Sequence, residues 1–153
     1  MTQRHFGLLV ANGALVLLAG FVIGFPYGVS VVHALAGDAL TGPFGDTRAW
    51  HMAHLEGVLN GMLMLAAAAA ARSLPLGVRG AGIVFWGLVA AGWTNVVAST
   101  ISALTGGRGT SITGLDWNTL DYALFMLGIL GAVSAVVTLA GAGLRSAREK
   151  PSA

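Results

Sequence analysis

The feature that most constrains this chain is a set of four long apolar stretches. The first runs from Phe6 to Gly37 without a single Lys, Arg, Asp or Glu. A helix needs about 20 apolar residues to cross a bilayer, and charged residues make up 9% of this chain against about 25% in soluble domains. We therefore predict an all-α membrane protein in which residues 1–153 form one four-transmembrane-helix bundle. The predicted spans are about 6–35, 50–72, 78–104 and 118–144.

Composition excludes several classes of chemistry. Cysteine is absent, which removes disulfides, thiolate catalysis and cysteine-ligated metals. The net charge is only +2, and the cations sit at the ends of apolar runs instead of on one face, so no nucleic-acid partner is expected. No nucleophile-elbow motif or strand-linked phosphate loop occurs. The first apolar stretch is followed by no cleavage signal, and we expect it to be retained.

The distribution of cations predicts the orientation. Six of the eight lysines and arginines fall on one predicted side of the membrane, and only Arg48 and Arg108 fall on the other. Basic residues favour the cytoplasmic side, so we expect both termini in the cytoplasm. The six inner cations are Arg4, Arg72, Arg79, Arg145, Arg148 and Lys150.

Polar side chains gather in the outer half of the predicted bundle. From a rise of about 1.5 Å per residue, His54 lies about 6 Å in from Trp50, and Asn60 about 15 Å in. On the next span Asn95 lies about 13 Å below Leu104. Polar groups at membrane depth turn toward the bundle interior and often mark function. A site is therefore predicted here, with Ser99, Tyr122 and His33 at similar depth.

Several of these residues also have purely structural interpretations. Asn60 and Asn95 are compatible with a hydrogen bond that joins two helices, and His33 with an interfacial position. Glu56 is expected to be protonated or paired, with Arg48 or His51 as the candidate partners. The spacing of His51, His54 and Glu56 is also compatible with a non-haem metal site, although no second helix carries such a pattern.

Small residues predict close helix packing. Gly20, Gly24 and Gly28 form a small-xxx-small ridge on the first span, which favours helix–helix contact. Asn12, in the inner half, has no obvious partner and is interpreted as a packing residue. A lone histidine at the depth of His54 is more typical of a metal or prosthetic-group ligand than of a packing residue.

The residues around His54 resemble those of the styrene oxide isomerase family. The matching segments are Trp50, Ala53-His54, Leu59-Asn60-Gly61-Met62, Gly92-Trp93-x-Asn95-Val96 and Arg108-Gly109. The four-span similarity covers about residues 6–143, and specific matching is confined to about 50–64 and 92–109.

This resemblance implies a trimer of four-helix protomers, with haem b at the protomer interfaces and His54 as its axial ligand. We place Trp50, Trp93 and Asn95 in the cofactor site on the same ground, and Asn60 beside the substrate. Ferric iron would act as a Lewis acid on a small apolar epoxide. The implied reaction is a Meinwald rearrangement of an aryl epoxide to an aldehyde, in the inner membrane of a bacterium.

One position departs from the family pattern. The family has a tyrosine on the third span, four residues beyond the asparagine, and this chain has Ser99 there. Tyr122 is a candidate to supply the hydroxyl, so the expected catalytic residues are Asn60, Ser99 and Tyr122. Two rival hypotheses stay open. One is a b-type electron-transfer or quinone-linked protein with His33 as second ligand, and the other is a non-catalytic or haem-free membrane subunit.

Overall fold

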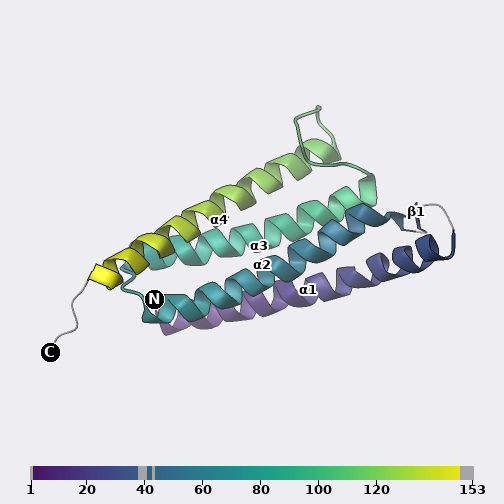
Figure 1. The fold of residues 1–153 in the computed structure, drawn as a ribbon. Coiled ribbons are helices and arrows are strands. Elements are labelled where there is room, and N and C mark those ends of the chain that lie inside the picture. The colour runs from purple at the N-terminus through teal and green to yellow at the C-terminus, as the bar shows by residue number, and fades with distance from the viewer. Residues whose placement is uncertain (1, 38–40, 43, 149–153) are drawn as a thin grey trace.

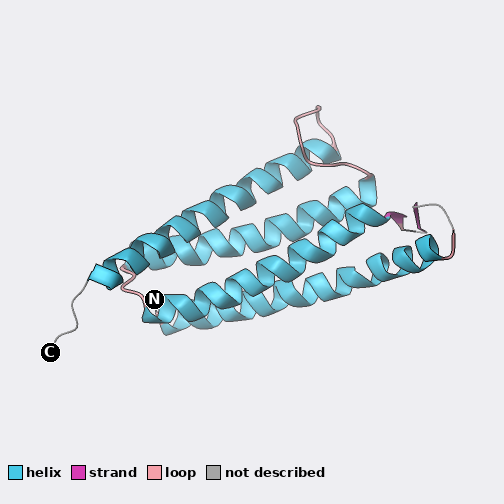
Figure 2. Ribbon diagram, viewed as in Figure 1, coloured by secondary structure: helices cyan, strands magenta, loops and turns pink. Residues whose placement is uncertain are grey.

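Four helices make up almost all of the structure, a computed structural model that describes residues 2–37, 41–42 and 44–148 (Figure 1, Figure 2). Each is long and apolar enough to span a membrane. The only strands in the described part of the chain are β1 (Thr41–Gly42) and β2 (Gly45–Asp46), which pair antiparallel. The all-α membrane fold is thus confirmed. The helices are α1 (Gln3–Leu35), α2 (Thr47–Ser73), α3 (Val78–Thr105) and α4 (Trp117–Arg148).

The predicted spans coincide closely with these helices. Each span lies within one helix and ends within four residues of it at either end. The first turn of α1 and the last turn of α4 lie at the same end of the bundle (Figure 1). Polar caps satisfy the free N–H groups of a first turn, and α1 and α2 each begin after such a residue. Thr2 accepts from the N–H of His5, and Asp46 from the N–H of Arg48.

The bundle consists of two helix pairs joined through its centre. α1 packs mainly on α2 and α4 on α3, while α2 and α3 face each other (Figure 1). Glycine makes the first of these contacts possible, because a Cβ atom at Gly20 would lie 2.6 Å from the backbone nitrogen of Val58. The predicted glycine ridge is therefore confirmed at Gly20. At Gly28 nothing in this chain lies within 4 Å of an added Cβ, so Gly28 makes no close helix contact within one copy.

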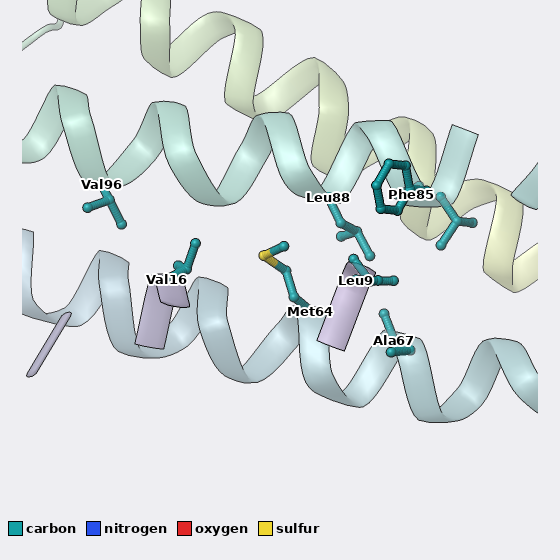
Figure 3. Packing of buried hydrophobic residues seen from close by; sticks show 10 residues of the cluster. Leu9, Val16, Met64, Ala67, Phe85, Leu88 and Val96 are labelled. Carbon is teal, nitrogen blue, oxygen red and sulfur yellow. The ribbon is translucent and has the colours of Figure 1, made fainter. Parts of the chain in front are cut away.

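The apolar core fills the half of the bundle that is nearer to the start of α1. Met64 of α2 lies between Leu9 and Val16 of α1 and Leu88 of α3, and all four are buried (Figure 3). Such close packing leaves no room for polar groups. The polar side chains of the spans lie mostly in the other half, beyond this core. The core thus acts as the rigid base on which the polar half is built.

Candidate functional site

The imidazole of His54 is held by the backbone of a neighbouring helix. Its Nδ1 lies 2.9 Å from the carbonyl oxygen of Gly20 on α1. A carbonyl only accepts hydrogen bonds, so Nδ1 carries the proton and donates it, and in the neutral ring Nε2 keeps its lone pair. Within the described residues Nε2 makes no hydrogen bond. Metal-binding histidines are oriented in this way, with one nitrogen tied to a carbonyl and the other available.

The ring of His54 has space because Gly24 carries no side chain. A Cβ atom at Gly24 would lie 3.0 Å from Nδ1 of His54. Since Gly20 and Gly24 are four residues apart, they lie on one face of α1, one turn from each other. The glycines that predicted helix contact therefore also form the cradle of this imidazole.

An apolar groove opens beside His54. Its volume is about 570 Å³, within the range of about 300–1,000 Å³ that is typical of cofactor and ligand sites. Aromatic and aliphatic side chains of α1 line most of it, and polar atoms contribute little. Such a groove suits a flat, apolar ring system better than a charged ligand. The lining residues are Phe21, Gly24, Phe25, Gly28, Val29, Val32, His33 and His54.

Tyr27 is a site residue that the sequence analysis missed. Its ring stacks on His51 with centroids 4.8 Å apart, and lies nearly parallel to His54 at 6.0 Å. The available signal was helical spacing, because Gly20, Gly24 and Tyr27 at i, i+4 and i+7 share one face of α1. Tyr27 thus forms a wall for both histidines of α2.

A second polar cluster lies on the other side of α2. Asn60 Nδ2 donates to the main-chain oxygen and to Oε2 of Glu56, both at 2.8 Å. Across the helix boundary, Asn95 Nδ2 lies 3.5 Å from Asn60 Oδ1, the long limit for a hydrogen bond. The interhelical contact between the two asparagines, one of the structural interpretations above, is therefore present.

The expected partners of Glu56 were wrong. Its carboxyl group accepts from Asn60, and in the described part of the chain it pairs with neither Arg48 nor His51. Nor do the described residues contain a group of three His, Asp or Glu that could hold a metal ion. Because His51 turns to Tyr27 and Glu56 to Asn60, the structure gives no support to the non-haem metal alternative.

Ser99 lies one turn from Asn95 and lines a cavity at the end of the bundle where α3 ends and α4 begins. The cavity has a volume of about 390 Å³ and is also lined by Met52, Phe125 and Arg108. The Ser99 hydroxyl donates to the carbonyl oxygen of Asn95 at 2.7 Å, so it is bonded within its own helix. Through Ser99 the cavity comes within one helical turn of Asn95 along α3.

The buried carboxylate of Asp121 is a second feature that the sequence analysis missed. Ser102, which lines the same cavity, donates to Asp121 Oδ2 at 2.7 Å. Asp121 is fully buried although it stands in the first turns of α4. An isolated buried carboxylate is costly, and this pair fixes α4 against α3 beside the cavity.

Three further predicted site residues lie apart from both clusters. Trp93 donates to Asn12 Oδ1 at 2.9 Å, so the expectation that Asn12 has no partner was wrong. Asn12 is eight residues from Gly20, about 12 Å along α1. Trp50 donates to the carbonyl oxygen of Phe44 at 2.6 Å and closes the preceding loop. Tyr122 is half-buried and makes no hydrogen bond within the described residues.

The predicted site residues thus do not share one face. His54 and Asn60 are six residues apart, which turns their side chains about 240° around α2. His54 consequently faces Gly20 of α1, and Asn60 faces Asn95 of α3. The chain presents an apolar groove with an imidazole on one side of α2 and a carboxamide layer below a cavity on the other.

Comparison with known proteins gives one finding. The family model described as styrene oxide isomerase matches residues 5–144, from the first turn of α1 to the last turns of α4. The match therefore includes both polar clusters. No curated protein matches the chain.

Proposed function

The chain belongs to the styrene oxide isomerase family, and on this premise we propose that it is a haem b-dependent membrane isomerase of aryl epoxides. Family membership supports an isomerase-type activity, and the four apolar helices make it a membrane protein. The cofactor, the substrate and the reaction are the proposal.

The observation that carries the proposal is the state of His54. Its Nδ1 is tied to the Gly20 carbonyl, and its Nε2 is available beside an apolar groove of about 570 Å³. Haem b is flat and largely apolar, and one neutral imidazole holds its iron from one side. The donor atom and the lining of the groove therefore both fit haem. His54 is the residue that would hold it, with Phe21 and Phe25 against the ring.

When bound, ferric haem supplies a Lewis acid for the epoxide oxygen. The rearrangement is redox-neutral and stays within the substrate. The benzylic C–O bond breaks, a hydride moves from the neighbouring carbon to the benzylic carbon, and the neighbouring carbon becomes the aldehyde. The residues of the chain position the substrate and keep water out of the site. Water would trap the electron-poor benzylic carbon as a diol, and the apolar groove excludes it.

The two faces of α2 support an assembly of several copies. In one chain His54 and Asn60 face different helices, and the groove beside His54 is open. We propose a homotrimer in which the groove of one copy is closed by the next copy. The side of α2 that carries Asn60 stays packed on α3 of its own copy. Mass measurement of the detergent-solubilised protein tests this, since haem should be lost when the copies separate.

The proposed location is the inner membrane of a bacterium, with both termini in the cytoplasm. The even number of helices and the common end of α1 and α4 are consistent with this orientation (Figure 1). A reporter fused after Lys150 should be active only in the cytoplasm. A reporter that reads out on the outer side would contradict the orientation, because it would place the cavity beside Ser99 on the cytoplasmic side.

One observation favours electron transfer as the second candidate function. His33 and His54 line the same groove, and a b-type electron carrier needs two axial ligands. Both histidines, however, line one groove of one chain, whereas two axial ligands must approach the iron from opposite sides. Absorption spectra of the oxidised and reduced protein distinguish the two functions, because low-spin bis-imidazole features belong to the carrier alone.

The decisive test of the isomerase is turnover without a reductant. Purified ferric protein should convert an aryl epoxide to the aldehyde, and a deuterium placed on the terminal epoxide carbon should be retained in the product. Reduction to the ferrous state should slow the reaction, because ferrous iron is the weaker Lewis acid. The assignment would have to be dropped if neither the native chain nor Ser99→Tyr isomerised any of a panel of aryl and aliphatic epoxides.

A further inference from the structure

The neighbours of Asn60 decide which end of its side chain is available. A carboxamide carries two N–H donors at one end and a carbonyl acceptor at the other. Here two acceptors, the main-chain oxygen and Oε2 of Glu56, lie 2.8 Å from Nδ2. The main-chain oxygen has no hydrogen to give, so the nitrogen must be the atom that faces it. The orientation of the Asn60 amide is thereby fixed.

Both N–H groups of Asn60 are consequently in use, and only its carbonyl oxygen remains available. That oxygen faces α3, where its nearest donor is Asn95 at 3.5 Å. A carbonyl oxygen has two lone pairs, so this long contact leaves it able to interact with another group. Ser99, one turn from Asn95 on α3, lines the cavity of about 390 Å³.

On its other side Asn95 packs against α4. Its Oδ1 is buried and has no hydrogen-bond partner within the described residues. The position opposite on α4 is Gly128, where any Cβ atom would collide with Asn95 Oδ1. Because the Asn60 oxygen only accepts hydrogen bonds, Asn95 turns its nitrogen toward Asn60 and its oxygen toward Gly128. The donors in this layer all point one way, from Asn95 to Asn60 to Glu56.

We propose that Glu56 is a positioning residue for the isomerisation: it takes up an N–H of Asn60, so that Asn60 presents its carbonyl oxygen to the substrate. This inference rests on the proposed function. The partial negative charge of that oxygen faces the benzylic carbon, which becomes positive as its C–O bond breaks. Preorganised dipoles of this kind stabilise developing charge most strongly in water-free sites. Asn60 does not donate to the epoxide oxygen.

The arrangement itself is tested without any turnover. The chain has four asparagines, Asn12, Asn60, Asn95 and Asn118, so selective ¹⁵N-asparagine labelling in nanodiscs gives four side-chain NH₂ pairs. Loss of one pair in Asn60→Leu assigns Asn60. Both of its protons should exchange slowly in the native protein. In Glu56→Leu one proton should shift and exchange faster, while Glu56→Gln, which still offers a carbonyl acceptor, should stay close to native.

Kinetics test the consequence for the reaction. Glu56→Leu should lower kcat by about tenfold to a hundredfold with little change in KM, because a mispositioned group costs rate more than binding. The loss should be larger for epoxides with an electron-withdrawing para substituent, whose benzylic carbon most needs stabilisation. Glu56→Gln should restore most of kcat. The matched control is Thr100→Val, which removes a hydrogen bond that stays within α3 and should leave kcat unchanged.

Two results would overturn the positioning role. One is an unchanged Asn60 signal and unchanged kcat in Glu56→Leu. The other is a Glu56→Gln variant as slow as Glu56→Leu, which would assign a proton or charge of Glu56 to the reaction instead. A native protein that isomerises no epoxide would remove the proposed function and with it the catalytic role of Glu56. The NH₂ signals would in that case still show whether Glu56 holds Asn60.

Discussion

The two faces of α2 solve the problem of a polar group in a membrane in different ways. On the α1 side His54 is bound by a backbone carbonyl, and glycines give its ring space. On the α3 side Asn60 is bound by the side chains of Glu56 and Asn95. The α1 side depends on glycines, which have no side chain to fill the space. The α3 side depends on hydrogen bonds between polar side chains. We therefore expect the α1 side to be sensitive to larger side chains and the α3 side to be sensitive to the loss of a polar group.

The largest effect is expected from His54→Ala. It removes the nitrogen that would hold the haem iron in our proposal, so haem content should fall to near zero with the four helices still inserted. The Soret absorbance per mole of purified protein measures this. His33→Ala is the control and should retain haem. Haem at native stoichiometry in His54→Ala would refute the ligand assignment.

Gly20→Ala should have the next largest effect. The added Cβ would lie 2.6 Å from the backbone nitrogen of Val58, where no flexible side chain can move aside. Overpacking of this kind costs about 1–3 kcal/mol, and it displaces the carbonyl that orients His54. Both the thermal unfolding midpoint and the haem content should fall.

Gly28→Ala provides the matched control on α1. Nothing in this chain lies within 4 Å of a Cβ atom there, so the stability of an isolated copy should be unchanged. Equal effects of Gly20→Ala and Gly28→Ala would contradict the claim that the α1 face depends on one close glycine contact.

On the α3 face, Asn60→Ala should lower turnover by about tenfold to a hundredfold and leave haem bound. It removes the carboxamide but neither the imidazole nor the Gly20 carbonyl. Activity per bound haem is the quantity to measure. Asn12→Ala is the control, because it also removes a partly buried hydrogen bond of a carboxamide, to Trp93, far from His54. A parallel loss in both variants would show that Asn60 matters only for packing.

Ser99→Tyr is expected to act in the opposite direction. It introduces the hydroxyl that the family pattern has at this position, and the adjoining cavity of about 390 Å³ can receive the ring. One added hydrogen bond is worth about 0.5–1.5 kcal/mol, so turnover of styrene-like epoxides should rise by about twofold to tenfold. An unchanged or lower rate with haem and stability intact would show that a hydroxyl at position 99 does not assist the reaction in this chain.

The smallest effect is expected at Asp116, just before α4 and outside both faces of α2, where a substitution by Asn should change only the pH dependence of folding stability. The backbone N–H of Thr119 and the hydroxyl of Thr113 donate to Asp116 and lower the pKa of its carboxyl below the ordinary 3.8. A lowered pKa stabilises the folded state above pH 3.8, and this contribution is lost as pH falls through the folded-state value. Asp116→Asn should remove the pH dependence below pH 4 and keep the cap.

The readout for this prediction is amide hydrogen exchange at Leu120, the first turn of α4. Faster exchange in Asp116→Ala than in Asp116→Asn is expected, because Asn still accepts the Thr119 N–H and Ala does not. A pH dependence in Asp116→Asn equal to that of the native protein would assign the effect to another group.

The four helices and the depth of the polar residues along them were predictable from the composition and the order of residues in the sequence. Apolar stretches of fixed length determine where helices span a membrane, and the depth of His54, Asn60 and Asn95 follows from counting residues along them. The family pattern around Ala53-His54 was equally readable. These properties are local, since they depend on neighbours in the sequence and on the bilayer as a solvent.

Only the tertiary structure decided which face each polar group takes and what holds it there. The sequence did not reveal that His54 binds a carbonyl of α1, that Trp93 reaches Asn12, or that Asp121 is buried against Ser102. The physical reason is that partner choice depends on the rotation of each helix about its axis. That rotation is set by many weak contacts along the whole helix, above all by where two glycines let the backbones approach.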